Sequence, residues 1–269
     1  MIFSKFHGAG NDFIMVDNRD SEYFIFSEHV AKLCHRRFGI GADGLIILHK
    51  SLIPNVDFKM LYFNSDGNLG SMCGNGGRSF VAFLDTLGLM DKKVTFEAYD
   101  GLHDAEILWK GENEWLIELE LRDVDNVEVL SPNEFFLDTG SPHLVVFVDN
   151  LNEIDITEMG RKLRYDSRFA PNGTNVNFVS HKNGVIFART YERGVEDETL
   201  SCGTGVTASA IAAKEFYDIP DDKIKVKAKG GSFDISFKKE GEIITDIRLK
   251  GPVRKVYSGK VDLHTDAQI

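Results

Sequence analysis

The chain contains the same loop-and-helix pattern twice, in residues 62–78 and again in residues 191–207. In each copy a tyrosine ends an apolar segment, an acidic loop follows, and a cysteine at the same spacing opens Cys-Gly-x-Gly. These cysteines are Cys73 and Cys202. Apolar helix-forming residues come next in both copies, closed by Gly or Pro, as is typical of buried helices. The repetition predicts an internally duplicated protein with each cysteine just before a helix.

A cysteine at the start of a helix has particular chemistry. The helix start offers unpaired N–H groups and a partial positive charge, which together bind anions. We therefore expect both thiols to ionise more easily than a free cysteine, whose pKa is about 8.5. The glycines after each sulfur allow a ligand carboxylate to approach the backbone closely.

Charge and cysteine usage exclude several classes of protein. The 269 residues carry a net charge of −11, which argues against nucleic acid or an anionic membrane as a partner. The first residues do not resemble a signal peptide, and no apolar run is long enough to span a membrane, so we expect a cytoplasmic protein. Three cysteines without metal-ligand spacing predict free thiols and no metal site. Cys34 falls on a predicted helix and is expected in the core.

The first half reads as short strands around one long helix. A strand, a glycine turn ending at Asn11 and a second strand are followed by a helix predicted over residues 28–38. Residues 39–44 match the dinucleotide-binding pattern G-x-G-x-x-G. That fingerprint must follow a strand and open a helix, whereas here a helix precedes it and a strand follows. Nucleotide binding is therefore rejected.

The second half repeats this order beyond the cysteine loop. The turn at residues 138–143 and the strand after it correspond to the opening turn and strand, and a helix is predicted near 157–164. We expect an α+β fold of two pseudo-symmetric domains, each a β-rich barrel-like sheet wrapped around a central helix. The predicted domains are residues 1–123 joined by 254–269, and residues 124–253. The active site is expected in the cleft between them.

A pseudo-twofold axis would bring both helix starts and both thiols together. A carboxylate held between the helices would leave its α-carbon between the two sulfurs. One thiolate would remove the α-proton while the opposite thiol returned a proton to the other face, which inverts the centre. The pattern therefore predicts a two-base epimerase or racemase.

These motifs resemble the diaminopimelate epimerase family, and the resemblance covers the whole chain. It is carried by the opening His7-Gly-Ala-Gly-Asn-Asp-Phe13, Phe63-Asn-Ser-Asp-Gly67, Cys73-Gly-Asn-Gly-Gly-Arg78, Asn175-Val-Asn-Phe178, Tyr191-Glu-Arg-Gly194 and Cys202-Gly-Thr-Gly205. The resemblance implies cofactor-independent interconversion of LL- and meso-diaminopimelate, in lysine and peptidoglycan precursor synthesis. The implied partner is this small-molecule substrate, and the implied assembly is a homodimer.

The resemblance also implies roles for individual residues. Cys73 and Cys202 correspond to the acid and the base, and His143 and Glu192 to groups that tune the thiols. The implied substrate contacts are Asn11, Asn64, Gly74, Asn75, Asn175, Glu192, Arg193, Gly203 and Thr204. Arg193 is suited to a carboxylate and Glu192 to an ammonium group, which fits a substrate with two amino-acid head groups. Alone, a Glu-Arg pair in a loop is more often a solvated turn, and a lone histidine is often structural.

The chain departs from the family pattern at two positions. Ser141 stands where many members have a ligand-binding asparagine, and Gly44 lies near the position of a glutamine contact in some members. Tyr257 aligns with a tyrosine that the family uses in dimerisation, although an aromatic near a strand end is usually part of the core.

Three alternative functions were weighed. Proline racemases and hydroxyproline epimerases also use two cysteines, but their substrates have one head group and do not need the Glu192–Arg193 pair. PhzF-like isomerases carry an acidic residue in place of a cysteine, so two intact copies disfavour them. A thiol redox switch between Cys73 and Cys202 is the remaining alternative, and no Cys-x-x-Cys motif promotes it.

Overall fold

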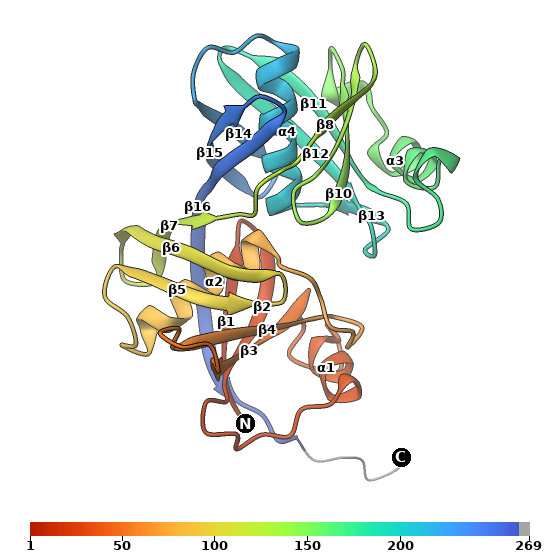
Figure 1. Ribbon diagram of the computed structural model, residues 1–269. Coiled ribbons are helices and arrows are strands. Elements are labelled where there is room, and N and C mark those ends of the chain that lie inside the picture. The colour runs from red at the N-terminus through yellow and green to blue at the C-terminus, as the bar shows by residue number, and fades with distance from the viewer. Residues whose placement is uncertain (264–269) are drawn as a thin grey trace.

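The computed structural model describes residues 1–263 and consists of two similar halves joined by one long strand (Figure 1). Each half wraps strands around a central helix, as predicted. The helices α2 (Gly74–Thr86) and α4 (Gly203–Phe216) are these central elements. The predicted α+β class with two barrel-like halves is confirmed. No helix among residues 1–263 has the length and apolar character needed to cross a bilayer.

The first half is a closed barrel of eight strands. Its order is β1-β2-β3-β4-β5-β6-β7-β16, and β1 pairs with β16 to close the ring. The strands are β1 (Ile2–Gly8), β2 (Asn11–Asp17), β3 (Gly44–Lys50), β4 (Phe58–Asn64), β5 (Lys93–Ala98), β6 (Gly101–Lys110), β7 (Glu114–Glu120) and β16 (Ile243–Lys260). In β7 buried and more exposed residues alternate, so every second side chain packs inward toward α2. The barrel interior is therefore the core that surrounds this helix.

The second half repeats this arrangement around α4. Its strands are β8 (Val127–Ser131), β9 (Glu134–Asp138), β10 (Pro142–Phe147), β11 (Asn175–Lys182), β12 (Val185–Glu192), β13 (Asp197–Thr199), β14 (Lys223–Ala228) and β15 (Gly231–Glu240), with α3 (Ile156–Arg164) and short 3₁₀ turns at Leu151–Glu153 and Ser167–Phe169. The parallel pairs β2–β3 and β4–β5 of the first half correspond to β10–β11 and β12–β14 here. This correspondence of pairings supports the predicted duplication.

The strand β16 belongs to both halves. It pairs with β15 up to Lys250 and with β7 from Gly251 onward, so the change of partner lies close to the predicted boundary at residues 253/254. The division into two domains remains a prediction. Of the segment 254–269 assigned to the first domain, residues 264–269 lie outside the described part of the chain.

One predicted element is shorter than expected. The helix expected over residues 28–38 is α1 (Ser27–Cys34). It ends because His35 adopts an extended conformation and its Nδ1 accepts hydrogen bonds from the backbone N–H groups of Arg37 and Phe38. These bonds fix a turn in place of the last helical residues. Cys34 is buried, as predicted.

Candidate active site

The two cysteines occupy equivalent positions at two helix starts that touch. Cys73 is the N-cap of α2 with φ −116° and ψ 117°, and Cys202 is the N-cap of α4 with φ −117° and ψ 117°. A Cβ atom built on Gly203 would lie 3.1 Å from the Cα of Gly74 and 3.2 Å from the N of Asn75. A side chain at position 203 would press on the backbone of the other helix, which would have to shift by a few tenths of an ångström. Two sets of helix-start N–H groups therefore converge in one place.

A cavity of about 400 Å³ opens between the halves beside Cys73. Five predicted site residues line it: Asn11, Asn64, Cys73, Glu192 and Arg193. The other predicted residues are not among those that line it: Gly74, Asn75, His143, Asn175, Cys202, Gly203 and Thr204. Cys202 is 8% exposed and follows Ser201, which does line the cavity.

The sulfur of Cys73 has a donor on one side and an acceptor on the other. The N–H of Gly76 donates to Sγ at 3.4 Å, and the thiol donates to Oδ1 of Asn11 at 3.6 Å. The Asn11 amide is oriented by Asp43, since its Nδ2 donates to Oδ2 of Asp43 at 2.8 Å. Asn11 thus presents its oxygen to the sulfur, and this favours the protonated thiol.

The sulfur of Cys202 instead lies beside a threonine hydroxyl. Thr204 Oγ1 lies 3.4 Å from Sγ and 2.9 Å from Nε2 of His143. On the far side of the imidazole, Nδ1 lies 3.1 Å from Nδ2 of Asn177. The Asn177 amide is oriented by two further bonds, because its Nδ2 donates to Leu144 O and its Oδ1 accepts from Thr190 Oγ1.

These bonds fix the donor and the acceptor at each step of the hydrogen-bond series from Asn177 to Cys202. Asn177 donates to Nδ1 of His143, so the ring proton is on Nε2 and donates to Thr204. The Thr204 hydroxyl then donates to Cys202, which favours a thiolate there. Burial lowers the pKa of His143 to about 3, and the charge of Arg193 adds to this, so the imidazole is neutral.

The expectation of easily ionised thiols is wrong for this structure. Burial raises the pKa of Cys73 to about 11, and the N–H groups of Gly76 and Asn75 only partly oppose it. Burial also raises the pKa of Cys202, with a further contribution from the Glu192 carboxylate. The free energy of removing a thiolate from water is larger than the stabilisation that the N–H groups and partial positive charge of the helix start provide.

Two of the expected substrate contacts, Asn75 and Thr204, use their side chains within the protein. The Asn75 amide donates to the carbonyl and hydroxyl of Ser201 and accepts a 2.6 Å bond from Arg78. The Thr204 hydroxyl is hydrogen-bonded to His143 and Cys202. The backbone N–H groups of Asn75 and Thr204, and not their side chains, are therefore the groups that could donate to a ligand.

Glu192 and Arg193 bring charge to the cavity. Burial raises the pKa of Glu192 to about 7, although Thr199 Oγ1 donates to its Oε2 at 2.8 Å. The backbone N–H of Arg193 donates to Oδ1 of Asn175 at 2.9 Å, which anchors this corner of the loop. Among residues 1–263 no carboxylate lies within ion-pair distance of the Arg193 guanidinium, unlike the surface ion pairs elsewhere.

The departures from the family pattern also have structural consequences. Ser141 Oγ accepts a 3.0 Å bond from Nδ2 of Asn175, so these two residues hold each other. Gly44 begins β3 with the ring of Tyr62 against its Cα. Tyr257 is 44% exposed and stacks edge-on against Phe3, so it is not a core residue.

Sequence reasoning missed Tyr62 and Asp43, which both line the cavity. Tyr62 precedes Asn64 by two positions in β4, and alternate residues of a strand share a face, so this signal was available. Asp43 had no comparable signal, because its role depends on Asn11 from another strand. Within residues 1–263 no group of three or more His, Cys, Asp or Glu side chains is arranged to hold a metal ion.

Comparison with known proteins shows the same duplication. The family model described as diaminopimelate epimerase matches residues 3–124 and again residues 135–256. The diaminopimelate epimerase of Flavobacterium psychrophilum is 49% identical over 94% of this chain and 97% of its own length. That of Chlorobaculum tepidum is 41% identical over 95% and 99%.

Solved structures share the fold at low identity. A hydroxyproline epimerase from Agrobacterium vitis superposes with a TM-score of 0.71 at 14% identity, covering 96% of this chain and 91% of that one. A PhzF-family phenazine biosynthesis protein from Bacillus anthracis gives 0.70 at 16% identity, covering 97% and 98%.

Proposed function

Because this chain belongs to the diaminopimelate epimerase family and is therefore an amino-acid epimerase, we propose that it interconverts LL- and meso-diaminopimelate with Cys73 and Cys202 as the two bases and without a cofactor. The observation that carries the proposal is the pair of cysteine N-caps with equal backbone angles at two touching helix starts. The product would serve lysine and peptidoglycan precursor synthesis. The reducing cytoplasm, which keeps thiols free, is the proposed location.

The reacting carboxylate is held at the helix starts. Backbone N–H groups of Gly74, Asn75, Gly203 and Thr204 are the donors, and the positive ends of α2 and α4 add to their effect. A carboxylate there accepts bonds from both halves at once, so its α-carbon is presented to both sulfurs. The same N–H groups stabilise the negative charge that develops as the α-proton leaves.

The hydrogen-bond directions support one set of starting protonation states. Cys202 receives a proton donor from Thr204 and acts as the thiolate base. Cys73 has an acceptor in Asn11 and acts as the thiol that returns a proton to the opposite face. The opposite reaction starts with these states exchanged. Since burial raises the pKa of Cys202, the positive charge of the substrate ammonium group is needed to stabilise the thiolate.

The second head group selects the substrate. Arg193 lines the cavity without a carboxylate partner and forms a bidentate contact with the distal carboxylate. Glu192, when ionised, pairs with an ammonium group. An imino acid such as proline has no distal groups and would leave both charges unpaired, which disfavours the proline racemase alternative.

Exchange of the α-proton with solvent deuterium tests the proposal. Purified protein without added cofactor should incorporate deuterium into LL-diaminopimelate and not into proline. Cys73→Ala and Cys202→Ala should each abolish epimerisation. Near-normal turnover in either variant would remove the two-base assignment, and a preference for proline would favour the racemase alternative.

We also propose that the protein is a homodimer through the segment of β16 that carries Tyr257. Tyr257 is 44% exposed and its neighbour Val256 is 54% exposed, which is unusual for large apolar side chains. Tyr257 pairs with Lys5 of β1, so the segment lies beside the strand that closes the barrel. Sedimentation should give a dimer, and Tyr257→Asp should shift it toward monomer. A wild-type monomer at micromolar concentration would refute the assignment.

A further inference from the structure

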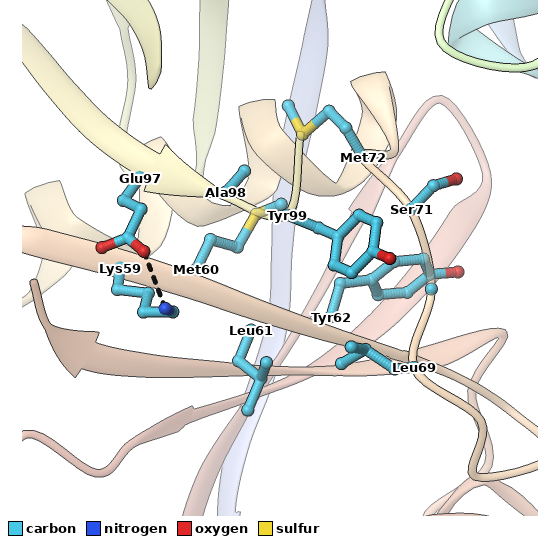
Figure 2. A pocket seen from close by; sticks show the side chains of 11 residues that line it. Lys59, Met60, Leu61, Tyr62, Leu69, Ser71, Met72, Glu97, Ala98 and Tyr99 are labelled. Atoms are coloured by element: carbon cyan, nitrogen blue, oxygen red, sulfur yellow. Dashed lines mark hydrogen bonds and ion pairs between the residues drawn. The ribbon is translucent and has the colours of Figure 1, made fainter. Parts of the chain in front are cut away.

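Tyr62 forms the wall between the catalytic cavity and a second cavity. The second cavity, of about 200 Å³, is lined by Tyr62 together with Met60, Met72 and Tyr99 (Figure 2). Tyr62 also lines the catalytic cavity, where Asn64 lies two positions further along the same strand. The Tyr62 side chain therefore lines the candidate active site and also borders the second cavity.

The Tyr62 ring lies in a slot made by two glycines. A Cβ on Gly44 would come within 2.5 Å of Cε2 of the ring, and a Cβ on Gly70 within 2.5 Å of both Cδ1 and Cε1. Neither glycine has a positive φ, so the backbone does not require glycine at these positions. The absence of a side chain makes room for the ring from both sides.

Two further contacts fix the ring. The N–H of Gly70 donates to the Tyr62 carbonyl at 2.9 Å, which holds one side of the slot at a set distance. Phe13 meets the ring edge-on at a centroid distance of 6.0 Å and an angle of 77°. A ring held in this way presents its hydroxyl in one direction, at little cost in conformational entropy on binding.

The hydroxyl itself has no hydrogen-bond partner among residues 1–263. Burial raises the pKa of Tyr62 well above its usual value of 10, and the Glu192 carboxylate, when ionised, adds to this. The phenol is therefore neutral and keeps its proton. The Tyr62 hydroxyl is thus a proton donor without an acceptor in the wall of the cavity that Cys73 also lines. Gly44, which packs against the ring, has no side chain that could contact a ligand there.

We propose that Tyr62 is a specificity-determining residue whose hydroxyl donates a hydrogen bond to a carboxylate of the bound diamino acid. The inference rests on the proposed function for the identity of the ligand. Its structural part, the glycine slot, is independent of that function and can be tested separately.

Tyr62→Phe keeps the ring in its slot and removes only the donor. Loss of a hydrogen bond to a charged group weakens binding about 10- to 100-fold. We therefore expect kcat/KM for diaminopimelate to fall about tenfold or more, mainly through a higher KM. Tyr99→Phe is the matched control, because Tyr99 lines only the second cavity and should change kcat/KM less than twofold. A smaller fall in Tyr62→Phe would overturn the inference.

A double-mutant cycle tests the slot. Gly70→Ala should lower the unfolding temperature in the wild-type background, because the new methyl group meets the ring. In the Tyr62→Leu background the same change should cost much less. Equal costs in both backgrounds would show that the ring does not require the slot.

The two proposals fail in different ways. If the wild-type protein exchanges no α-proton of diaminopimelate, the proposed function fails whatever Tyr62 does. If the wild type is active and Tyr62→Phe matches it, only the inference about Tyr62 fails.

Discussion

Asn177 determines which nitrogen of His143 carries the proton. Its Nδ2 lies 3.1 Å from Nδ1 of the imidazole, and the same amide nitrogen donates to Leu144 O at 3.2 Å. Nδ1 is thereby an acceptor, and the proton on Nε2 points to Thr204. A residue that touches neither cysteine thus orients the donor that reaches Cys202.

Asn177→Asp should reverse this arrangement. An aspartate offers an acceptor to Nδ1, so the ring proton moves there, Nε2 accepts from Thr204, and Cys202 loses its donor. We expect kcat/KM to fall about 10- to 100-fold. Nitrogen NMR of labelled histidine in the folded variant should show the tautomer change. Thr190→Val is the control, because Leu144 still orients the Asn177 amide, and an unchanged His143 tautomer in Asn177→Asp would contradict the assignment.

The pH dependence of kcat/KM should be bell-shaped. Glu192 must be ionised to pair with an ammonium group, and its pKa is raised to about 7, so activity should rise with pH through this value. At high pH the Cys73 thiol, with a pKa of about 11, loses the proton that it must donate, so activity should fall. In Glu192→Gln the limb near pH 7 should disappear. Persistence of that limb would assign it to another group.

Glu192 should also make stability depend on pH. Its pKa is raised from 4.5 to about 7 on folding, so its contribution is fully present below pH 4.5 and is lost as pH rises through 7. Across this range wild type should lose about 3 kcal/mol relative to Glu192→Gln, with no further change above it. Urea unfolding of both proteins at pH 4.5, 6 and 8 measures the difference, and a constant difference would show that burial does not perturb this carboxyl.

Equivalent glycines of the two helices should respond differently to substitution. A methyl group on Gly203 meets the backbone of Gly74 and Asn75, whereas a methyl group on Gly74 first meets the flexible end of Leu249 at 2.9 Å. Gly203→Ala should therefore separate the helix starts by a few tenths of an ångström and lower kcat about 10-fold, since a displacement near 1 Å lowers it about 100-fold. Gly74→Ala should be milder. Equal losses would show that contact between the helix starts is not what the reaction requires.

Much of the fold was predictable because its signals are local and repeated. The strand patterns, the stops at Gly88 and Pro220 and the matching cysteine loops predicted two similar halves with a central helix in each, and the structure confirms them. The end of α1 was not predictable, because a side-chain contact of His35 with the following backbone ends it.

The sequence by itself determined that two cysteines would stand at two helix starts, and its resemblance to the family implied that Asn64, Glu192 and Arg193 would share one site with Cys73. Only the tertiary structure decided their chemical state. Burial overrides the helix start and raises the thiol pKa values, because desolvation depends on everything packed around the sulfur. The donor chain from Asn177 to Cys202 and the slot around Tyr62 join residues distant in sequence, and their effect comes from distances and directions that residue order does not encode.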